Sequence, residues 1–476
     1  MLSIELNDLI KQIIKTKAES QTIEVKAAHK GTPKRLYDTL SSFSNQDSGG
    51  IIVFGLDESL GFEPVGVYDL QDLQKKMTEQ CNQMDPVVRA IFTTTEYEGV
   101  NICSAEIPSI DITNRPCYYR GAGKTKGSYV RVGDADLPMT DYEIYSFESY
   151  KAHVHDDERP IDRADLSLLD EAGINNYILQ MKLNRPYFSK LSEEQIYELL
   201  SITRNGVPTL ASILNFGIYP QGLLPQLAIT ATVIPGTEIG ETTNDGVRFL
   251  DNKRIEGTLS EMLDEAIAFC NRNMRTQTII DSKTGKRNDK TEYPINAIRE
   301  AILNALIHRD YSIHTEGTTI QISFFTDRLE IHSPGSLYGR MTVNDLGKAR
   351  PDLRNPALAT MSEFLLKTEN RYSGIPTIRR EMQEYGLPEP LFENRRNEFV
   401  VTLFNKPETS INNSEDNTDL LAFCKTPRTR QEISDYLGLK TTQYVSKNYI
   451  QPLVNQGKLK LLDPDKPKSK NQKYYS

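Results

Sequence analysis

The sequence predicts an α/β protein of several domains, and three observations lead to this prediction. The chain has 476 residues, more than one hydrophobic core usually holds, and a typical size of about 150 residues per domain suggests three domains. Strand-like and helix-like patterns alternate along most of the chain. Two polar stretches, 155–165 and 405–417, interrupt this alternation and have the composition of linkers. We therefore expect domains at 1–150, 160–405 and 418–476.

The composition is typical of a globular protein in a reducing compartment. Hydrophobic residues make up 38% and charged residues 25% of the chain, and no apolar run approaches the roughly 20 residues of a membrane helix. Residues 1–20 have an amphipathic helical pattern without the apolar centre of a signal peptide. The five cysteines show no CxxC spacing, so no zinc or disulfide framework is indicated. We expect a cytoplasmic protein with reduced thiols and no membrane partner.

Charge is distributed unevenly along the chain. The net charge is −9, which argues against a protein that coats nucleic acid with its whole surface. Residues 419–476 nevertheless contain eleven Lys or Arg against five Asp or Glu, a local balance of +6. A basic end on an acidic body indicates a local site for a polyanion.

The N-terminal domain is expected to alternate helices and strands around a Gly-Gly turn at 49–50. The predicted helices are 1–20, 33–44 and 69–83, the predicted strands are 21–26, 48–58, 91–95 and 100–108, and 116–134 is predicted to form a hairpin or looped strand pair.

Acidic residues near the first strand form the first candidate site. Glu19, Glu24 and Lys26 follow the spacing Glu-x4-Glu-x-Lys, and a further acid follows at Asp57 or Glu58. Two or three carboxylates can bind a divalent cation that activates water, and a lysine can stabilise the developing charge. Alternatively, Glu24 and Lys26 lie on one face of a strand and pair with each other. An exposed ion pair contributes only about 0–1 kcal/mol, so stability alone explains them weakly.

Three motifs give this domain a family resemblance. The sequences ESQTIEVKAAHKG, LSSFSNQDSGGIIVFGLDES and GSYVRVGD resemble the Schlafen/AlbA-type domain over residues 15–145. In Schlafen nucleases the equivalent acids cut RNA, which would make Glu19, Glu24, Lys26, Asp57 and Glu58 catalytic and Glu24 a metal ligand. In bacterial regulators with this domain, the resemblance implies nucleic-acid or nucleotide binding without cleavage.

The middle domain is predicted to be a second α/β sandwich. Its expected helices are 167–182, 191–202 with Ser192 as N-cap, 258–274 and 294–308, and its expected strands lie within 225–235, 319–325, 328–335 and 398–404.

The helix predicted at 294–308 carries the second candidate site. Glu300 and Asn304 are spaced i and i+4, which places both on one helix face. An amide can hold a magnesium-bound phosphate while a carboxylate polarises water. Downstream, Gly335 and Gly374 could let the backbone approach a nucleotide closely.

The motifs INAIREAILNALIHRDYS, EIHSPGSL, RNPALA and SGIPTIRREM resemble the GHKL-like ATPase segment of "ATP-dependent DNA helicase-like" (divergent AAA) transcriptional regulators over about 295–404. The resemblance implies ATP and Mg²⁺ as cofactors, with Glu300 as general base and Asn304 as the magnesium ligand. It assigns Gly335 to the first nucleotide box and Gly374 to the glycine-containing lid. Ser333 stands where GHKL enzymes carry the adenine-binding Asp, and each box has fewer glycines. The alternative is a degenerate fold kept for packing or dimer contacts.

The C-terminal module has the pattern of a winged helix-turn-helix. A short helix at 419–424 precedes a second helix at 429–437, in which Thr429 and Glu432 form a capping-box pattern. Gly438 and Leu439 supply a turn before the third helix, 441–456. Two strand-like stretches then flank the loop PDKPKSKN.

In this interpretation the start of the third helix enters a DNA major groove and the wing holds phosphates. The alternative is a winged helix used for protein contacts or dimerisation. The candidate DNA-binding residues are Thr441, Thr442, Gln443, Ser446 and Lys447 on the helix, and Lys466, Lys468, Lys470 and Lys473 on the wing.

Three hypotheses for function follow. The favoured one is a DNA-binding transcriptional regulator whose middle domain senses a nucleotide, with double-stranded DNA as partner and a homodimer as the expected state. The others are a Schlafen-like metal-dependent endoribonuclease acting on RNA, and an ATPase of the GHKL type.

Overall fold

The computed structural model describes residues 1–280, 287–366, 373–405, 420–421, 423–437, 442–455, 458–463, 469 and 472–476. It confirms the predicted α/β class and divides the chain into two compact units, Met1–Val154 and His155–Ser476. All five cysteines are buried and none forms a disulfide. Within the described ranges, no helix has both the length and the apolar character needed to cross a membrane.

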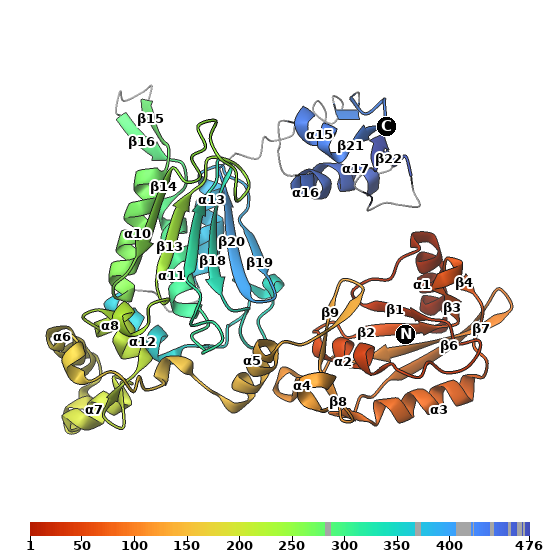
Figure 1. The fold of residues 1–476 in the computed structure, drawn as a ribbon, viewed down its shortest axis with the longest axis horizontal. Helices are drawn as coiled ribbons and strands as arrows, with labels where there is room; N and C mark the ends of the chain where they lie inside the picture. Colours follow the sequence, from red (N-terminus) through yellow and green to blue (C-terminus); the bar gives the residue numbers. More distant parts are fainter. Residues whose placement is uncertain are drawn as a thin grey trace. The chain divides into compact units, whose positions relative to one another are not determined.

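The N-terminal unit is a three-layer α/β/α arrangement around one sheet (Figure 1). Alternate residues of the central strand face opposite layers: Val53 packs with α1, whereas Ile52 and Phe54 pack with α2 and α3. The strand order is β1 (Ile23–Lys26), β2 (Gly50–Phe54), β7 (Val100–Ile107), β6 (Ile91–Tyr97), and the helices are α1 (Ser3–Thr16), α2 (Tyr37–Asn45) and α3 (Leu70–Cys81). Only β1 and β2 run parallel.

Short elements complete this unit. The strand predicted near residue 130 is β9 (Tyr129–Val132), and it pairs with β10 (Ala135–Pro138). Strand β8 (Tyr118–Tyr119) is connected to this region by an isolated bridge between Tyr118 and Ser128, the residue before β9. Strand β8 instead pairs with β5 (Met84–Asp85). The remaining elements are β3 (Leu56–Asp57), β4 (Glu63–Pro64), α4 (Gly123–Gly127) and α5 (Asp141–Ala152).

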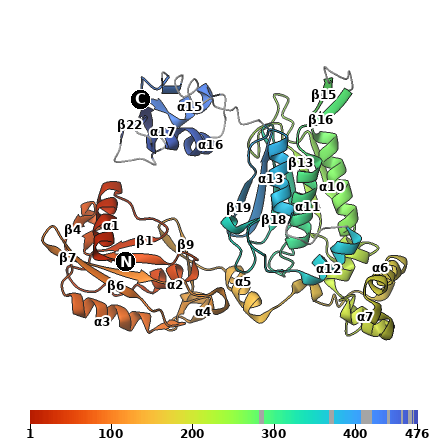
Figure 2. The same ribbon diagram turned by 180° about the vertical axis from the view of Figure 1, so that it is seen from behind.

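The second unit contains a six-stranded sheet covered by helices on one face (Figure 2). The strand order is β14 (Asp251–Ile255), β13 (Ile229–Val233), β17 (Ile320–Phe324), β18 (Arg328–Pro334), β20 (Glu398–Phe404), β19 (Leu391–Asn394). The covering helices are α10 (Leu259–Asn273), α11 (Ile295–His308) and α13 (Gly374–Glu384). Only β13 and β17 pair in parallel.

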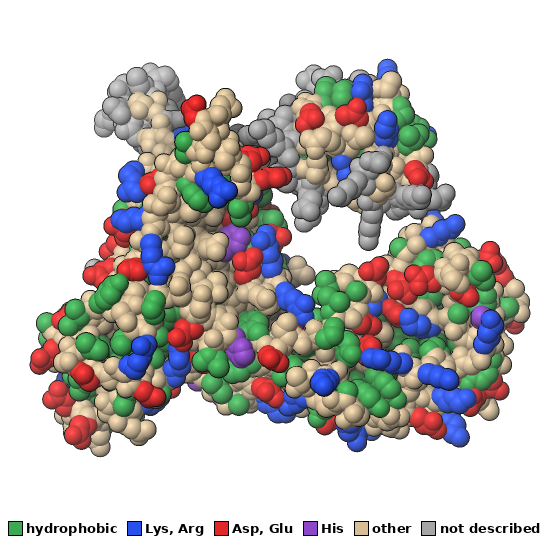
Figure 3. All heavy atoms as spheres, viewed as in Figure 1, with side chains coloured by type: hydrophobic (Ala, Val, Ile, Leu, Met, Phe, Trp, Pro, Cys, Tyr) green, Lys and Arg blue, Asp and Glu red, His purple; other side chains and the backbone are tan. Residues whose placement is uncertain are grey.

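The two faces of this sheet differ in chemistry because side chains alternate along each strand. Ile229, Ile322 and Leu329 point into the core with the helices. Thr230 and Gln321 point to the other face, which Figure 3 shows to be largely free of hydrophobic side chains. The hydrophobic core of this unit therefore lies on the helix-covered side of the sheet.

Further elements surround the sheet. Two helices, α12 (Pro356–Leu365) and α13, were not predicted from the sequence. Helix α12 follows a loop, and helix α13 contains a proline. The others are η3 (Asp156–Glu158), α6 (Glu171–Asn184), α7 (Glu193–Leu199), β11 (Thr203–Arg204), β12 (Val207–Pro208), α8 (Leu210–Phe216), α9 (Pro220–Leu223), β15 (Thr276–Ile280) and β16 (Arg287–Thr291).

The C-terminal module has helices around its own small core. Its predicted capping box at Thr429 is present at the start of α15 (Arg430–Tyr436). The third helix comprises α16 (Thr442–Val445), a π-helical turn (Ser446–Ile450) and α17 (Gln451–Asn455). A sheet in the order β21 (Arg428–Thr429), β23 (Lys473–Tyr475), β22 (Lys460–Leu461) completes it, and the core residues are Leu420, Cys424, Ile433, Val445, Ile450, Leu453, Leu459 and Tyr474.

One acidic side chain is enclosed at the start of the second unit. Asp157 is completely buried, and its Oδ2 accepts a hydrogen bond from the Leu358 backbone N–H at 2.9 Å. Burial raises the pKa of Asp157 to about 7, and the hydrogen bond from Leu358 acts in the opposite direction by lowering the pKa. The folded protein therefore binds a proton at this site more tightly than the unfolded chain does.

Replacing Asp157 by Asn should make the second unit less sensitive to pH. Because the pKa of Asp157 is higher in the folded than in the unfolded chain, protonation of Asp157 stabilises the fold at acidic pH. This stabilisation is lost as the pH rises from about 4 to 7. The difference between the unfolding temperatures of Asp157→Asn and the native chain should therefore shift in favour of Asp157→Asn as the pH rises from 5 to 8. The energy involved can reach a few kcal/mol, since one pKa unit corresponds to about 1.4 kcal/mol.

Thermal unfolding across this pH range measures the effect. Asp165→Asn is the control, because Asp165 is exposed and the hydrogen bond from Ser167 lowers its pKa, so its contribution stays constant above pH 5. A pH-independent difference for Asp157→Asn would contradict the expectation.

Candidate functional site

A cavity of about 490 Å³ lies between α11, the end of β18 and the start of α13. Its lining includes all five residues that the sequence suggested for a nucleotide: Glu300, Asn304, Ser333, Gly335 and Gly374. They come from positions up to 74 residues apart in the chain, since 374 − 300 = 74. The structure thus brings the predicted set together, while its ligand stays a prediction.

Helix α11 positions the two polar residues by burying the rest of its surface. Ala297, Ile298, Ala301, Ile302, Ala305 and Leu306 are all at most 5% exposed and belong to the core. Glu300 and Asn304, one turn apart, line the cavity. The Glu300 carboxylate lies 3.4 Å from Arg299 Nη1, and Arg299 also donates to the Leu366 carbonyl at 3.0 Å.

Gly374 allows the start of α13 to approach these two side chains closely. A Cβ at this position would lie 3.1 Å from both Glu300 Oε2 and Asn304 Nδ2. Its φ is not in the left-handed region, so space rather than backbone conformation makes glycine suitable here. The preceding Ser373 makes no side-chain cap, so no serine oxygen occupies the first-turn N–H groups of this 11-residue helix.

Asn304 carries a polar group that the protein does not satisfy. Its Nδ2 is buried and has no hydrogen-bond partner within the described residues. A buried unpaired amide group is unfavourable by about 1–3 kcal/mol. An unpaired N–H donor beside a helix N-terminus fits a phosphate oxygen, whereas the amide oxygen of Asn304 and the Glu300 carboxylate have the chemistry of ligands for the bound cation. The residues present therefore fit a magnesium nucleotide.

The rest of the cavity is mainly apolar and of a size that accepts a flat ring. The Ser333 hydroxyl is directed to the Ala305 carbonyl at 3.3 Å, so it is already engaged by the protein. The acidic residues of the lining are Glu300 and Asp352. The apolar lining includes Ile331, Leu337, Tyr338, Met341, Leu346, Leu353, Ile375, Phe399 and Val401.

Gly335 lines the cavity, and protein atoms also approach it closely. Its φ is +100°, and a Cβ there would lie 2.4 Å from Asp310 Cβ and 2.7 Å from Arg354 Nη1. The close approach that requires glycine is therefore to protein atoms. Sequence reasoning missed the buried pair behind this wall, Asp310 and Arg354, whose charged groups are 3.5 Å apart.

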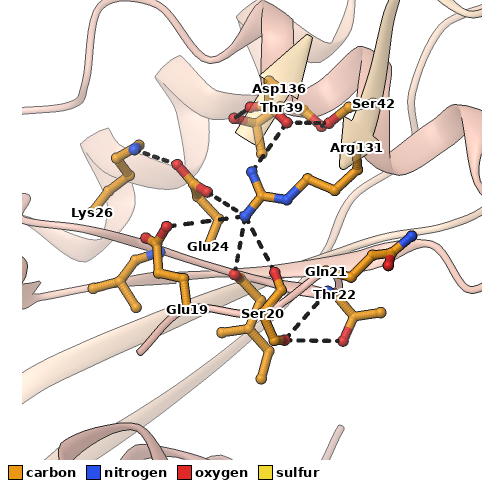
Figure 4. A network of polar contacts seen from close by, with 12 residues as sticks. Glu19, Ser20, Gln21, Thr22, Glu24, Lys26, Thr39, Ser42, Arg131 and Asp136 are labelled. Carbon is orange, nitrogen blue, oxygen red and sulfur yellow. Dashed lines mark hydrogen bonds and ion pairs between the residues drawn. The ribbon is translucent and has the colours of Figure 1, made fainter. Parts of the chain in front are cut away.

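The N-terminal candidate residues surround a buried arginine that sequence reasoning did not include (Figure 4). The Arg131 side chain is 1% exposed, and its Nη2 lies 2.8 Å from Glu24 Oε2 and 4.0 Å from Glu19 Oε2. Lys26 pairs with the other oxygen of Glu24. Arg131 lies in the YVRVG motif, which was recognised only as part of the family pattern.

Arg131 also connects the β9–β10 hairpin to α2. Its Nη1 lies 3.1 Å from Asp136 Oδ1. Asp136 in turn accepts hydrogen bonds from Thr39 at 2.6 Å and Ser42 at 2.5 Å (Figure 4). The guanidinium lies over the Phe43 ring, 5.2 Å from its centroid. The network thus links three parts of the N-terminal unit.

The other acids lie apart from this network. The Asp57 carboxylate accepts hydrogen bonds from the Ser59 backbone and hydroxyl, which lower its pKa, and Glu58 is exposed. Desolvation raises the pKa of Glu19 to about 7, and the charges of Glu24 and Glu58 act in the same direction. In the described part of the chain no group of three or more His, Cys, Asp or Glu is arranged to hold a metal. A metal at Glu24 would have to displace Lys26 or Arg131.

Only some of the predicted DNA-binding residues can be located. Thr442 and Ser446 are half-buried on the third helix, and Lys473 is exposed on β23. Thr441, Lys466, Lys468 and Lys470 lie outside the described residues, as do the side chains of Gln443 and Lys447.

Three family models match separate parts of the chain. "Schlafen, AlbA_2" matches residues 19–140, and "Putative ATP-dependent DNA helicase recG C-terminal" matches 317–403. "Filamentation induced by cAMP protein Fic-like, C-terminal domain" matches 417–475. The first two matches support the resemblances seen in the sequence, although the second begins after α11. The third connects the C-terminal module with a different family from the expected regulator.

Similarity to solved structures is weak. The DIP2311 protein from Corynebacterium diphtheriae aligns over 94% of this chain and 93% of its own, with 16% identity and a TM-score of 0.41. The N-terminal domain of a RecG-related protein from Nitrosomonas europaea aligns over 28% of this chain and 92% of its own, with 24% identity and a TM-score of 0.23. No curated protein matches the chain.

The chain is thus an α/β protein of two compact units with separate similarities along it. Residues 19–140 are similar to the Schlafen/AlbA_2 domain, and residues 317–403 are similar to an ATPase-type segment of the RecG C-terminal kind.

Replacing Arg131 by Met should strongly destabilise the N-terminal unit. The change leaves the buried Glu24 and Asp136 carboxylates without their shared cation, and removing one partner of a buried ion pair typically costs about 3–5 kcal/mol. Urea-dependent pulse proteolysis of the full chain, with fragments identified by mass spectrometry, would report the unfolding of residues 1–154. Lys11→Met is the control, because the Lys11–Asp8 pair is exposed and should contribute no more than about 1 kcal/mol. Equal effects of the two substitutions would contradict a structural role for Arg131.

Proposed function

We propose that this protein is a nucleotide-responsive, DNA-binding regulator whose second unit binds ATP with Mg²⁺. The observation that carries the proposal is the meeting of Glu300, Asn304 and Gly374 at one end of a cavity large enough for a nucleotide. An unpaired buried amide, a carboxylate and an uncapped helix start have the chemistry to bind a phosphate chain and its cation.

Different parts of the cavity would bind different parts of the nucleotide. The first turn of α13 would receive phosphate oxygens, and the apolar lining from Ile331 to Val401 would receive the base. Asn304 would hold the magnesium ion, which neutralises phosphate charge when it is bound. Glu300 would orient a water molecule toward the terminal phosphate. Each of these roles uses a side chain or helix end that already faces the cavity.

Binding is better supported than rapid turnover. Ser333 cannot accept from a base amine as a carboxylate does, and its hydroxyl is directed to Ala305. Glu300 also lies 3.4 Å from Arg299, which competes for its oxygens. A site of this kind suits a sensor that remains occupied.

The C-terminal module supplies the DNA-binding half of the proposal. Helix α15, then the helix from α16 to α17, then the β22–β23 strand pair have the order of a winged helix-turn-helix. The balance of +6 over 419–476 favours a phosphate backbone as partner. The family description that names a DNA helicase also points toward nucleic acid.

Gly374→Ala should weaken nucleotide binding without weakening the fold. The new Cβ would lie 3.1 Å from Glu300 and Asn304 and would narrow the phosphate end, whereas alanine is the better helix former. We expect the Kd for ATP with Mg²⁺ to rise about tenfold or more, equivalent to about 1.4 kcal/mol. Calorimetric titration gives the Kd, and the ligand-induced rise in melting temperature gives an independent measure.

Gly317→Ala is the matched control, because a Cβ there meets no atom within 4 Å. An unchanged Kd for Gly374→Ala would place the ligand elsewhere. Absence of any melting shift with ATP and Mg²⁺ in the native chain would overturn nucleotide binding itself.

Removing residues 418–476 should abolish retention on duplex DNA at moderate salt. Replacing the four wing lysines by Ala in the full chain should reduce the slope of log K against log salt by about 0.9 for each DNA phosphate that the protein no longer neutralises. Fluorescence anisotropy at several salt concentrations measures both effects. The lysines to replace are Lys466, Lys468, Lys470 and Lys473, and the control replaces the exposed Lys11, Lys15, Lys75 and Lys76. Unchanged retention after the deletion would defeat the regulator proposal.

A further inference from the structure

The residues that lead into the second unit contact one wall of the cavity. His155 Nδ1 lies 3.2 Å from the Arg354 carbonyl, and the Leu358 N–H donates to Asp157 Oδ2 at 2.9 Å. The sequence separations are 199 and 201 residues, so these contacts depend on the tertiary fold. They occur immediately after Val154, the last residue of the N-terminal unit.

The contacted segment is part of the cavity itself. Pro351, Asp352, Leu353, Arg354 and Ala359 line the cavity. Arg354 donates to the Ser336 carbonyl at 2.8 Å and lies over the Tyr338 ring, both on the facing loop. A change in the position of this segment would therefore change the shape of the cavity.

The same segment is connected to the helix that carries Glu300 and Asn304. The Asn355 side chain donates to the carbonyls of Ile307 at 2.8 Å and Arg309 at 2.7 Å, at the end of α11. Asn355 is the residue before α12 and makes no side-chain cap to it. The bonds to α11 hold its Nδ2, and its Oδ1, the atom that could accept from the first N–H groups of α12, has no hydrogen-bond partner among the described residues.

Asp157 replaces the missing local cap. Leu358 is the third residue of α12, the position whose N–H an N-cap side chain usually satisfies. Here the acceptor comes from η3, a part of the chain distant in sequence. The start of α12 is therefore satisfied in this way only while residues 155–158 stay in place.

We infer that residues 155–158 form a latch that positions the cavity wall through Asp157, and that ligand binding in the cavity and the seating of this latch favour each other. Asp157 is a positioning residue, because it acts through Leu358 and the 351–359 segment. Linkage makes the effect reciprocal: a latch that improves ligand binding by a given factor is itself stabilised by the ligand by the same factor. The identity of the ligand as a magnesium nucleotide rests on the proposed function.

The test compares two substitutions of Asp157 in the full chain. Asp157→Ala removes the acceptor for Leu358, whereas Asp157→Asn keeps an oxygen that can accept this hydrogen bond. We expect the Kd for ATP with Mg²⁺, measured by calorimetry at a temperature where all variants are folded, to rise about tenfold in Asp157→Ala and to stay within about twofold in Asp157→Asn. Asp165→Ala is the control, because Asp165 caps the neighbouring turn at Ser167 without contacting the cavity wall.

Hydrogen–deuterium exchange supplies the second measurement. ATP with Mg²⁺ should slow amide exchange at 153–160 as well as at 351–360 in the native chain, and the effect at 153–160 should disappear in Asp157→Ala. A merely structural aspartate would lower the melting temperature and leave the Kd and the ligand effect at 153–160 unchanged, which would overturn the latch.

Failure of the proposed function has a different signature. If the native chain shows no binding of ATP with Mg²⁺, the nucleotide assignment is overturned. The latch proposal is then tested by amide exchange in the ligand-free proteins. Exchange at 351–360 that is faster than in the native chain for Asp157→Ala, but not for Asp157→Asn, supports the latch, and equal exchange in the two variants overturns it.

Discussion

The burial of α11 between the sheet and its neighbouring helices is the constraint on which the second unit depends. Alanine at 297, 301 and 305 keeps this helix narrow, so that other elements can pack closely against it. A helix enclosed in this way has few positions at which a polar side chain is tolerated, because a buried polar group without a partner is unfavourable. Glu300 and Asn304 occupy such positions, and the cavity is the space that they face.

The two acidic clusters of the chain differ in how their charge is compensated. In the N-terminal unit, the Glu24 carboxylate already has two cationic neighbours, Lys26 and Arg131, which a bound ligand would have to displace. In the second unit, Asn304 carries a buried Nδ2 without a hydrogen-bond partner among the described residues, and it lines a cavity. A buried carboxylate between two cations is typical of a structural network, whereas an unpaired polar group facing a cavity is typical of a binding site. This difference is the physical reason for placing the ligand in the second unit.

Local patterns predicted much of the fold and part of the site. The N-cap at Ser192, the capping box at Thr429 and the i, i+4 spacing of Glu300 and Asn304 are properties of a few neighbouring residues, and all are present in the structure. Arg131 was not predicted to pair with Glu24, because 107 residues separate them (131 − 24 = 107) and no local pattern encodes that contact. The hairpin or looped strand pair expected within 116–134 has different bounds in the structure, because β9 pairs with β10, which begins after this segment.

The connections of the cavity explain why a site with few nucleotide-box glycines can still be useful. Its lining includes the segment held by Asp157, where the chain arrives from the N-terminal unit. It also includes Phe399 and Val401 of β20, the strand after which the chain continues to the C-terminal module. A ligand can shift an equilibrium only through contacts that differ between two states. The lining thus contains a segment that the entry residues 155–158 contact and part of the strand that precedes the exit. A nucleotide bound as proposed would contact both, and rapid hydrolysis is not required for that effect.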